Sequence, residues 1–299
     1  MPQLTLKQIQ IFDTVVRYKS HTRAATELHM TQPAVSMQMK QMELLLDVQL
    51  FERHGKSISL TKDAEELRKY SADIIRSYRA MMDQVNVLKG SEQGTLIVSV
   101  TTTANYFATR ILAAFSKMHP EIKISLDVTN RRKILTQLER NEPDQVIMGE
   151  PPDNLDLGSE VFLDNPLVII APPDHVLCKE KNIALHRLLQ EKFVLREKGS
   201  GTRAAIERHM EGFKDCTSSL EMSSNEAIKH AVAAGFGLGV VSKHTISMEL
   251  QNNYLKILNV EGFPINRHWH LVTRKGKVVS PVAQSFRQFL LKEAQNFVE

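Results

Sequence analysis

Residues 20–53, SHTRAATELHMTQPAVSMQMKQMELLLDVQLFER, read as two helices joined by a tight turn. The first helix is expected to run from about Thr22 to Leu28. Thr31 can cap the second helix with its side-chain oxygen, and Pro33 lies in the first turn, where no backbone N–H is needed. The inward stripe of the second helix, at steps of three and four residues, is Val35, Met39, Met42 and Leu46. The opposite face carries Gln32, Ser36, Met37 and Lys40.

This arrangement is typical of a helix-turn-helix, whose second helix enters the major groove of DNA with its N-terminal end. On spacing alone, a helical hairpin packed inside a core remains an alternative. The pattern S-x-T-R-A-A-x-x-L-x-x-T-Q-P-A-V-S-x-Q, followed by L-F-x-R, resembles the DNA-binding head of LysR-type transcriptional regulators. Two positions depart from the family pattern: Lys19 stands where the family often has glycine, and Asp47 stands where Leu-Gly is usual.

The segment VQLFERHGKSISLT, residues 48–61, predicts two short strands around His54, Gly55 and Lys56, and so a winged helix. Gln32 and Ser36 are expected to contact base edges, because amide and hydroxyl groups can pair there, whereas Lys56 is expected to contact phosphate. A solvated face is an equal alternative for Lys40. The expected DNA-contact set is Arg23, Thr31, Gln32, Pro33, Ser36, Met37, Lys40, Arg53 and Lys56.

Charge is concentrated in this head. Residues 1–62 hold eight Lys/Arg against five Asp/Glu, which is most of the net charge of +4 of the 299-residue chain. Positive charge attracts DNA phosphates and makes binding depend on salt. The N-terminus lacks the layout of a secretory signal and no apolar run reaches about 18 residues, so a cytoplasmic location is expected. Cys178 and Cys216 show no disulfide framework and no metal spacing, and we expect neither a metal nor a resident cofactor.

A long helix is predicted over residues 62–90, with Thr61 as its cap and Asp63 and Glu65 in the first turn. An apolar seam at heptad spacing favours a coiled coil and therefore a homodimer, or a homotetramer built from dimers. A helix packed on its own domain is the alternative. The seam positions are Ala64, Leu67, Ser71, Ile74, Tyr78, Met81, Val85 and Leu88.

After a glycine-containing joint at residues 90–94, strands and helices alternate, which predicts parallel α/β sheets in two lobes. The expected fold class is α/β: an N-terminal winged helix-turn-helix, a long linker helix and a two-lobed effector domain resembling periplasmic binding proteins. The final strand HWHLVTR and the helix after it, over residues 280–298, are expected to return to the first lobe. The predicted domains are residues 1–61, 62–90 and 95–299, with lobe I at about 95–165 and 270–299 and lobe II at about 166–269.

Polar loops follow three predicted strands, at the strand ends where ligands bind such sheets. Hydroxyls, glycines and free N–H groups at a helix N-terminus favour anions, and arginines add charge-assisted pairing. The alternative is that these side chains are ordinary helix caps and solvated arginines. The expected effector-binding set is Thr101, Thr102, Thr103, Asn130, Arg131, Gly149, Ser200, Gly201, Thr202 and Arg203.

The segments NYFATRILAAFSKMHP, NRRKILTQLERN and QVIMGEPP resemble the LysR-type branch that regulates Calvin-cycle (Rubisco) operons. This resemblance implies a phosphorylated sugar or NADPH as effector, operator DNA as a partner, and RNA polymerase as a further partner. Activation and repression both remain open.

Two other function classes are disfavoured. Residues 199–201 lack the full nucleophile-elbow spacing, and Gly235, Gly237 and Gly239 follow a predicted helix instead of a strand, so we expect no enzyme. A solute-binding transport protein would fit residues 95–299 alone. The N-terminal winged helix-turn-helix argues against it.

Overall fold

The computed structural model describes residues 3–54, 57–89, 93–188, 190–209 and 220–298. The chain divides into two compact units. The first comprises residues 1–91 together with 140–142 and 276–281, and the second comprises the remainder of residues 92–299. Each unit has its own apolar core.

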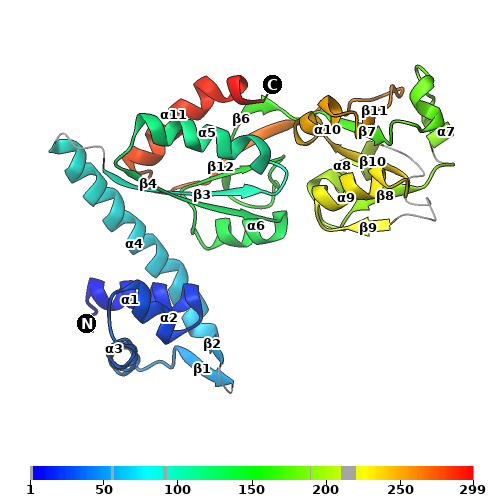
Figure 1. Ribbon diagram of the computed structural model, residues 1–299. Helices are drawn as coiled ribbons and strands as arrows, with labels where there is room; N and C mark the ends of the chain where they lie inside the picture. The colour runs from blue at the N-terminus through cyan, green and yellow to red at the C-terminus, as the bar shows by residue number, and fades with distance from the viewer. Residues whose placement is uncertain (1–2, 55–56, 90–92, 189, 210–219, 299) are drawn as a thin grey trace. The chain divides into compact units, whose positions relative to one another are not determined.

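The first unit begins as a winged helix-turn-helix (Figure 1). Its core joins three helices through residues such as Phe12, Ala24 and Val35, all at 0% exposure. The wing is an antiparallel hairpin in which Phe51 faces Leu60. The elements are α1 (Leu6–Tyr18), α2 (His21–Glu27), α3 (Gln32–Leu46), β1 (Phe51–His54) and β2 (Ser57–Leu60).

Side-chain caps fix where these helices begin. Ser20 accepts a hydrogen bond from the backbone N–H of Arg23, and Thr31 accepts one from Ala34. Lys19 and Asp47, which follow the last residues of α1 and α3, both have left-handed backbone conformations, at φ 48° and 53°. These are the two positions that depart from the family's glycines, and glycine adopts this conformation without steric cost.

The helix α4 (Lys62–Leu88) follows the wing and is capped by Thr61, as its sequence predicts. Several seam side chains are solvent-exposed in the single chain: Ile74 at 45%, Met81 at 54% and Leu88 at 79%. These three lie at heptad spacing. An exposed apolar seam of this kind is typical of a helix that pairs with a second copy.

The first lobe of the second unit is a five-stranded sheet in the order β4-β3-β5-β12-β6. Helices α5 and α11 cover one face, with Phe107, Phe115 and Phe286 in the core, and α6 packs on the other face (Figure 1). The elements are β3 (Gly94–Thr101), α5 (Asn105–Met118), β4 (Ile122–Thr129), α6 (Arg131–Glu139), β5 (Gln145–Met148), β6 (Leu157–Asp164), β12 (His268–Arg274), α11 (Pro281–Glu293) and η4 (Ala294–Phe297).

The second lobe is another five-stranded sheet, in the order β11-β7-β10-β8-β9. Its strands β7, β8 and β10 are buried throughout, which explains why their sequences are mainly apolar up to Arg196 at the end of β8 and Ser242 at the end of β10. The elements are β7 (Leu167–Ala171), η1 (Val176–Lys179), α7 (Leu185–Leu188), β8 (Phe193–Arg196), α8 (Gly201–His209), β9 (Leu220–Met222), α9 (Asn225–Ala233), β10 (Leu238–Ser242), η3 (Lys243–Thr245), α10 (Ser247–Gln251) and β11 (Lys256–Ile257).

The expectation of parallel sheets is correct for β3, β4 and β5 and for β8, β9 and β10, and it is wrong for the remaining strands of the two sheets. Strand β12 runs antiparallel to both β5 and β6, and β7 runs antiparallel to β10. Strand β6 was not expected at all. The physical reason is that the chain crosses between lobes near Asn165 and returns near Arg267, so the returning strand enters its sheet in the opposite direction.

These two crossing segments pair with each other. Asn165 N–H donates to the Arg267 carbonyl at 2.7 Å, and Leu167 exchanges backbone hydrogen bonds with Ile265. With β6 and β12 they form an antiparallel ribbon that runs through the junction of the lobes. We call residues 164–167 and 265–268 the hinge ribbon. Within the described residues of this unit it positions one lobe against the other beside the site described next.

Candidate functional site

The exposed face of α3 carries the side chains expected to meet DNA. Gln32 Nε2 donates to Ser36 Oγ at 2.7 Å, so these two side chains lie together one helical turn apart. Thr31, Pro33, Met37 and Lys40 are exposed on α3 or at its cap, as is Arg23 on α2. Meanwhile Val35, Met39 and Met42 are buried on the opposite side. The polar N-terminal half of α3 is therefore free to enter a groove.

Fewer of the expected DNA-contact residues can be described in the wing. Arg53 lies in β1, next to the hairpin's tip. Lys56 and the side chain of Arg53 fall outside the described part of the structure. Their expected contacts with DNA therefore stay predictions.

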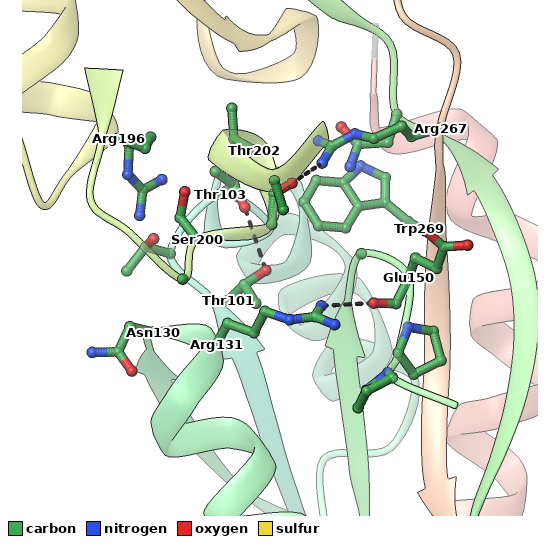
Figure 2. A pocket seen from close by; sticks show the side chains of 18 of the residues that line it. Thr101, Thr103, Asn130, Arg131, Glu150, Arg196, Ser200, Thr202, Arg267 and Trp269 are labelled. Carbon is green, nitrogen blue, oxygen red and sulfur yellow. Dashed lines mark hydrogen bonds between the residues drawn. The ribbon is translucent and has the colours of Figure 1, made fainter. Parts of the chain in front are cut away.

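A cavity of about 410 Å³ lies between the two lobes of the second unit. It lies at the carboxyl ends of β3, β4 and β5 in the first lobe and of β8 in the second (Figure 2). Parallel strands of both sheets thus direct their following loops into one space. Nine of the ten expected effector-binding residues line it: Thr101, Thr102, Thr103, Asn130, Arg131, Gly149, Ser200, Gly201 and Thr202.

The start of α8 forms one wall. Gly199 has a positive φ of 91°, which turns the chain from β8 into the helix. Ser200 Oγ accepts a hydrogen bond from the backbone N–H of Arg203 at 3.0 Å. Because the positive end of the helix dipole and two buried hydroxyl residues, Ser200 and Thr202, meet the cavity here, this wall favours negative charge.

Four guanidinium groups belong to the cavity wall, and only Arg131 was expected there; Arg196, Arg208 and Arg267 were not. Arg196 is neutralised, because its Nε and Nη2 both bond the Glu197 carboxylate at 2.7 and 2.9 Å. Arg208 pairs with the Glu150 carboxylate at 3.3 Å, with both side chains 68% exposed.

Arg131 and Arg267 differ from these two. Arg131 Nη1 donates to the backbone carbonyl of Glu150 at 2.6 Å, and Arg267 Nη1 donates to that of Gly201 at 3.0 Å (Figure 2). Within the described residues, neither guanidinium lies within salt-bridge distance of a carboxylate. A Cβ placed on Gly201 would lie 3.9 Å from Arg131 Nη1 and 4.0 Å from Arg267 Nη1. The two charges therefore flank the same point.

Burial makes these two charges unfavourable without a counterion. The pKa of Arg267 is lowered to about 10, first by burial and then by the positive charge of Arg208. Burial also lowers the pKa of Arg131, opposed by Glu150. Both groups remain protonated at neutral pH, so an anion entering the cavity would meet two partly desolvated positive charges.

Arg203 is a correction to the expected set. Its Nε bonds Glu207 Oε1 at 2.6 Å, one turn further along α8, and it is not among the residues that line the cavity. The Arg203 side chain leaves from the α8 face that carries Glu207, whereas Arg208 and Arg267 bring charge to the cavity. Sequence spacing gave no signal for Arg267, because only the hinge ribbon brings residue 267 beside residue 201.

Trp269 also lines this cavity, with 1% exposure, and it is the single tryptophan of the chain. Its indole Nε1–H donates to His244 Nδ1 at 3.3 Å. Burial lowers the pKa of His244. A neutral imidazole is what this hydrogen bond requires, because Nδ1 must accept.

Two family models match the chain. Residues 6–65 match the model of the bacterial regulatory helix-turn-helix protein, lysR family, and residues 89–295 match that of the LysR substrate binding domain. The chain belongs to the LysR family of DNA-binding transcriptional regulators. Its first unit therefore carries the LysR helix-turn-helix, and the cavity lies in the LysR substrate-binding domain.

Individual LysR relatives cover nearly the whole chain. The RuBisCO operon transcriptional regulator of Allochromatium vinosum is 49% identical over 292 residues, which is 97% of each chain. The HTH-type transcriptional activator CmpR of a Synechocystis strain is 41% identical over 97% of this chain and 96% of its own.

Two solved structures bear on the fold. The regulatory domain of Synechocystis CcmR, in complex with 2-PG (2-phosphoglycolate), is 42% identical with a TM-score of 0.64, covering 68% of this chain and 99% of that domain. Full-length OxyR from Pseudomonas aeruginosa has a TM-score of 0.77 at 19% identity, covering 98% of this chain and 95% of its own, and shows the fold alone.

Two further findings concern other site types. No helix among the described residues is long and apolar enough to span a membrane. The described residues also contain no group of three or more His, Cys, Asp or Glu side chains placed to hold a metal ion.

Proposed function

We propose that this LysR-family regulator controls carbon-fixation genes in response to a small anionic metabolite. The single observation that supports the effector is the pair Arg131 and Arg267, two partly buried positive charges flanking Gly201 in the interlobe cavity. The regulated genes are inferred from the 49% identical RuBisCO operon regulator.

The cavity bears on which anion fits. At about 410 Å³ it suits a phosphorylated compound of a few carbons better than a dinucleotide such as NADPH. The related CcmR domain binds 2-PG, which is of this size and charge. We therefore favour a phosphorylated sugar or sugar-derived acid as the effector, held by the nine lining residues of the expected set together with Arg208 and Arg267.

The DNA side of the proposal assigns two roles. Gln32 and Ser36 read base edges, because they present an amide and a hydroxyl on the exposed face of α3. The other expected contact residues hold the head against the duplex, mainly at phosphates. They are Arg23, Thr31, Pro33, Met37, Lys40, Arg53 and Lys56.

The exposed seam of α4 supports a homodimer, and two dimers would give a homotetramer. Two heads on one dimer match the two halves of a palindromic operator. RNA polymerase is the proposed further partner, since activation at a promoter requires contact with it.

The test uses Trp269 as a built-in reporter. Titrating the full-length protein with 2-phosphoglycolate, phosphorylated sugars and NADPH should change the Trp269 emission saturably for an anion that enters the cavity. Arg131→Met should lower the affinity for that anion, measured from the emission change, about tenfold or more, because a charge-assisted hydrogen bond is lost. Calorimetry separates binding of NADPH from its absorption.

Arg203→Gln is the matched control, because Arg203 lies on α8 but outside the cavity wall. It should leave the titration nearly unchanged. If none of these anions gave a saturable response, the anionic effector would be wrong. The family assignment would remain.

A further inference from the structure

The hinge ribbon contains an unusual pair of side chains. Asn165 is 1% exposed, and within the described residues neither its Oδ1 nor its Nδ2 has a hydrogen-bond partner. Arg267 Nε is likewise buried without a partner. Both residues line the interlobe cavity. Buried polar atoms are nearly always paired in folded proteins, so a cluster of three at one place calls for an explanation.

The ribbon's register places these two side chains together. Asn165 lies opposite Arg267, since its N–H donates to the Arg267 carbonyl, between the flanking pairs Asp164–His268 and Leu167–Ile265. Residues directly opposite in an antiparallel pair project their side chains to the same face, with Cβ atoms about 5 Å apart. The amide and the guanidinium are therefore neighbours on the cavity side.

Arg267 also connects this pair to the start of α8. Its Nη1 donates to the Gly201 carbonyl and its Nε is unpartnered, so one guanidinium lies between the α8 wall and Asn165. Two N–H donors, Arg267 Nε and Asn165 Nδ2, remain available for an oxygen pair such as a carboxylate. The hydroxyls and helix dipole at Ser200 and Thr202 suit a phosphate at the other end.

We infer that Asn165 and Arg267 form a recognition pair for the second anionic group, a carboxylate, of a phosphorylated hydroxy acid. This inference rests on the proposed anionic effector. The two donor atoms, Asn165 Nδ2 and Arg267 Nε, are covered in this structure, so a carboxylate reaches them when the hinge ribbon shifts, and the acceptor Asn165 Oδ1 takes no part in that contact. Binding of the second anion therefore selects a different arrangement of the lobes, because the ligand gains contacts only there.

Through this pair, recognition of the ligand's carboxylate is coupled to the movement of the lobes. A ligand with phosphate alone can occupy the α8 wall without reaching Asn165. A ligand with both groups reaches the hinge ribbon and shifts the lobes. The distinction gives a class of inducing ligands and a class of silent competitors.

Two matched probes test this on the full-length protein. 2-Phosphoglycolate carries phosphate and carboxylate, and ethyl phosphate replaces the carboxylate with a methyl group. Calorimetry should show that the wild type prefers 2-phosphoglycolate by about tenfold or more, as expected for hydrogen bonds to a charged group. Asn165→Leu and Arg267→Met should each remove most of that preference. Asn165→Leu should also retain the wild-type affinity for ethyl phosphate within a few-fold.

Stability without ligand separates recognition from a structural role. Leucine has the same branching at Cγ and the same number of side-chain heavy atoms as asparagine but no polar atoms, so Asn165→Leu should unfold at the same temperature as the wild type or higher. A clear fall in its unfolding temperature would show that the amide maintains the fold, and would overturn the inference. Asn252→Leu, at an exposed amide that bonds the Met248 carbonyl at 2.8 Å, is the control and should alter neither binding constant.

The outcomes separate the two proposals. If Asn165→Leu lowered the affinity for both probes equally, or changed the affinity for neither probe, the recognition pair would be overturned and the anionic effector would stand. Failure of both probes to bind the wild type would overturn the small phosphorylated effector and the pair with it.

Discussion

Lys19 and Asp47 each destabilise the DNA-binding head through an unfavourable backbone conformation. Both follow a helix with positive φ, where a side chain is sterically unfavourable and glycine is not. We expect Lys19→Gly and Asp47→Gly each to raise the free energy of unfolding by about 0.5–1 kcal/mol, since the relief exceeds the extra entropy of the unfolded glycine. Urea unfolding measures this. Lys89→Gly, at φ −85°, is the matched control and should not stabilise.

Gln32 and Lys56 should separate reading from positioning. Gln32→Ala removes a base-edge group and should relax sequence preference, whereas Lys56→Ala removes a phosphate contact. Lys56→Ala should weaken specific and nonspecific DNA equally and reduce the salt slope by about 1. Fluorescence anisotropy across a salt series measures both. Identical behaviour of the two variants would contradict the division of roles.

His244 should make stability depend on pH. Its pKa is lowered in the folded protein, first by burial and then by Lys243, with Asp164 opposing. As pH falls below about 6.5, the unfolded chain takes up a proton on this imidazole before the folded one does, so stability declines. Above that pH the contribution is complete. His244→Gln can still accept from Trp269 and should show a smaller decline between pH 7.5 and 5.5 in urea unfolding; an unchanged slope would contradict this assignment.

At the scale of one element, α4 carries the assembly. Ile74 and Met81 are one heptad apart and exposed, so a charge at either should split a dimer seam. We expect Met81→Glu to lower the mass in light scattering to that of a monomer at micromolar concentration. Lys69→Glu, off the seam and 51% exposed, should retain the oligomer. If the wild type were monomeric, the alternative of a helix packed on its own domain would be favoured instead.

At the scale of the whole molecule, effector and operator should affect each other equally. If the effector changes operator affinity by some factor, operator DNA must change effector affinity by the same factor, typically about 5–150-fold in coupled systems. Titrating the Trp269 emission with and without a DNA fragment selected for tight binding measures one side, and anisotropy measures the other. Equal effector affinity with and without DNA would show that the two sites are uncoupled.

The amino-acid sequence by itself determined the local features. Caps, apolar spacing and wing signals in residues 20–61 depend on neighbours within a few positions, so Thr31, Pro33 and the buried stripe of α3 could be predicted. The three strand-end loops were equally predictable, because each lies directly after an apolar run. Eight expected residues in these loops, together with Gly149 after β5, do line one cavity.

The tertiary structure alone decided the rest. Strand direction in the two sheets, the place of β6 and the approach of Arg267 to Gly201 depend on where the chain crosses between lobes and returns. Arg203 and Arg208 are five positions apart on one helix, yet only Arg208 lines the cavity. Direction and pairing across long sequence separations are fixed by packing of the two lobes, and no local pattern encodes them.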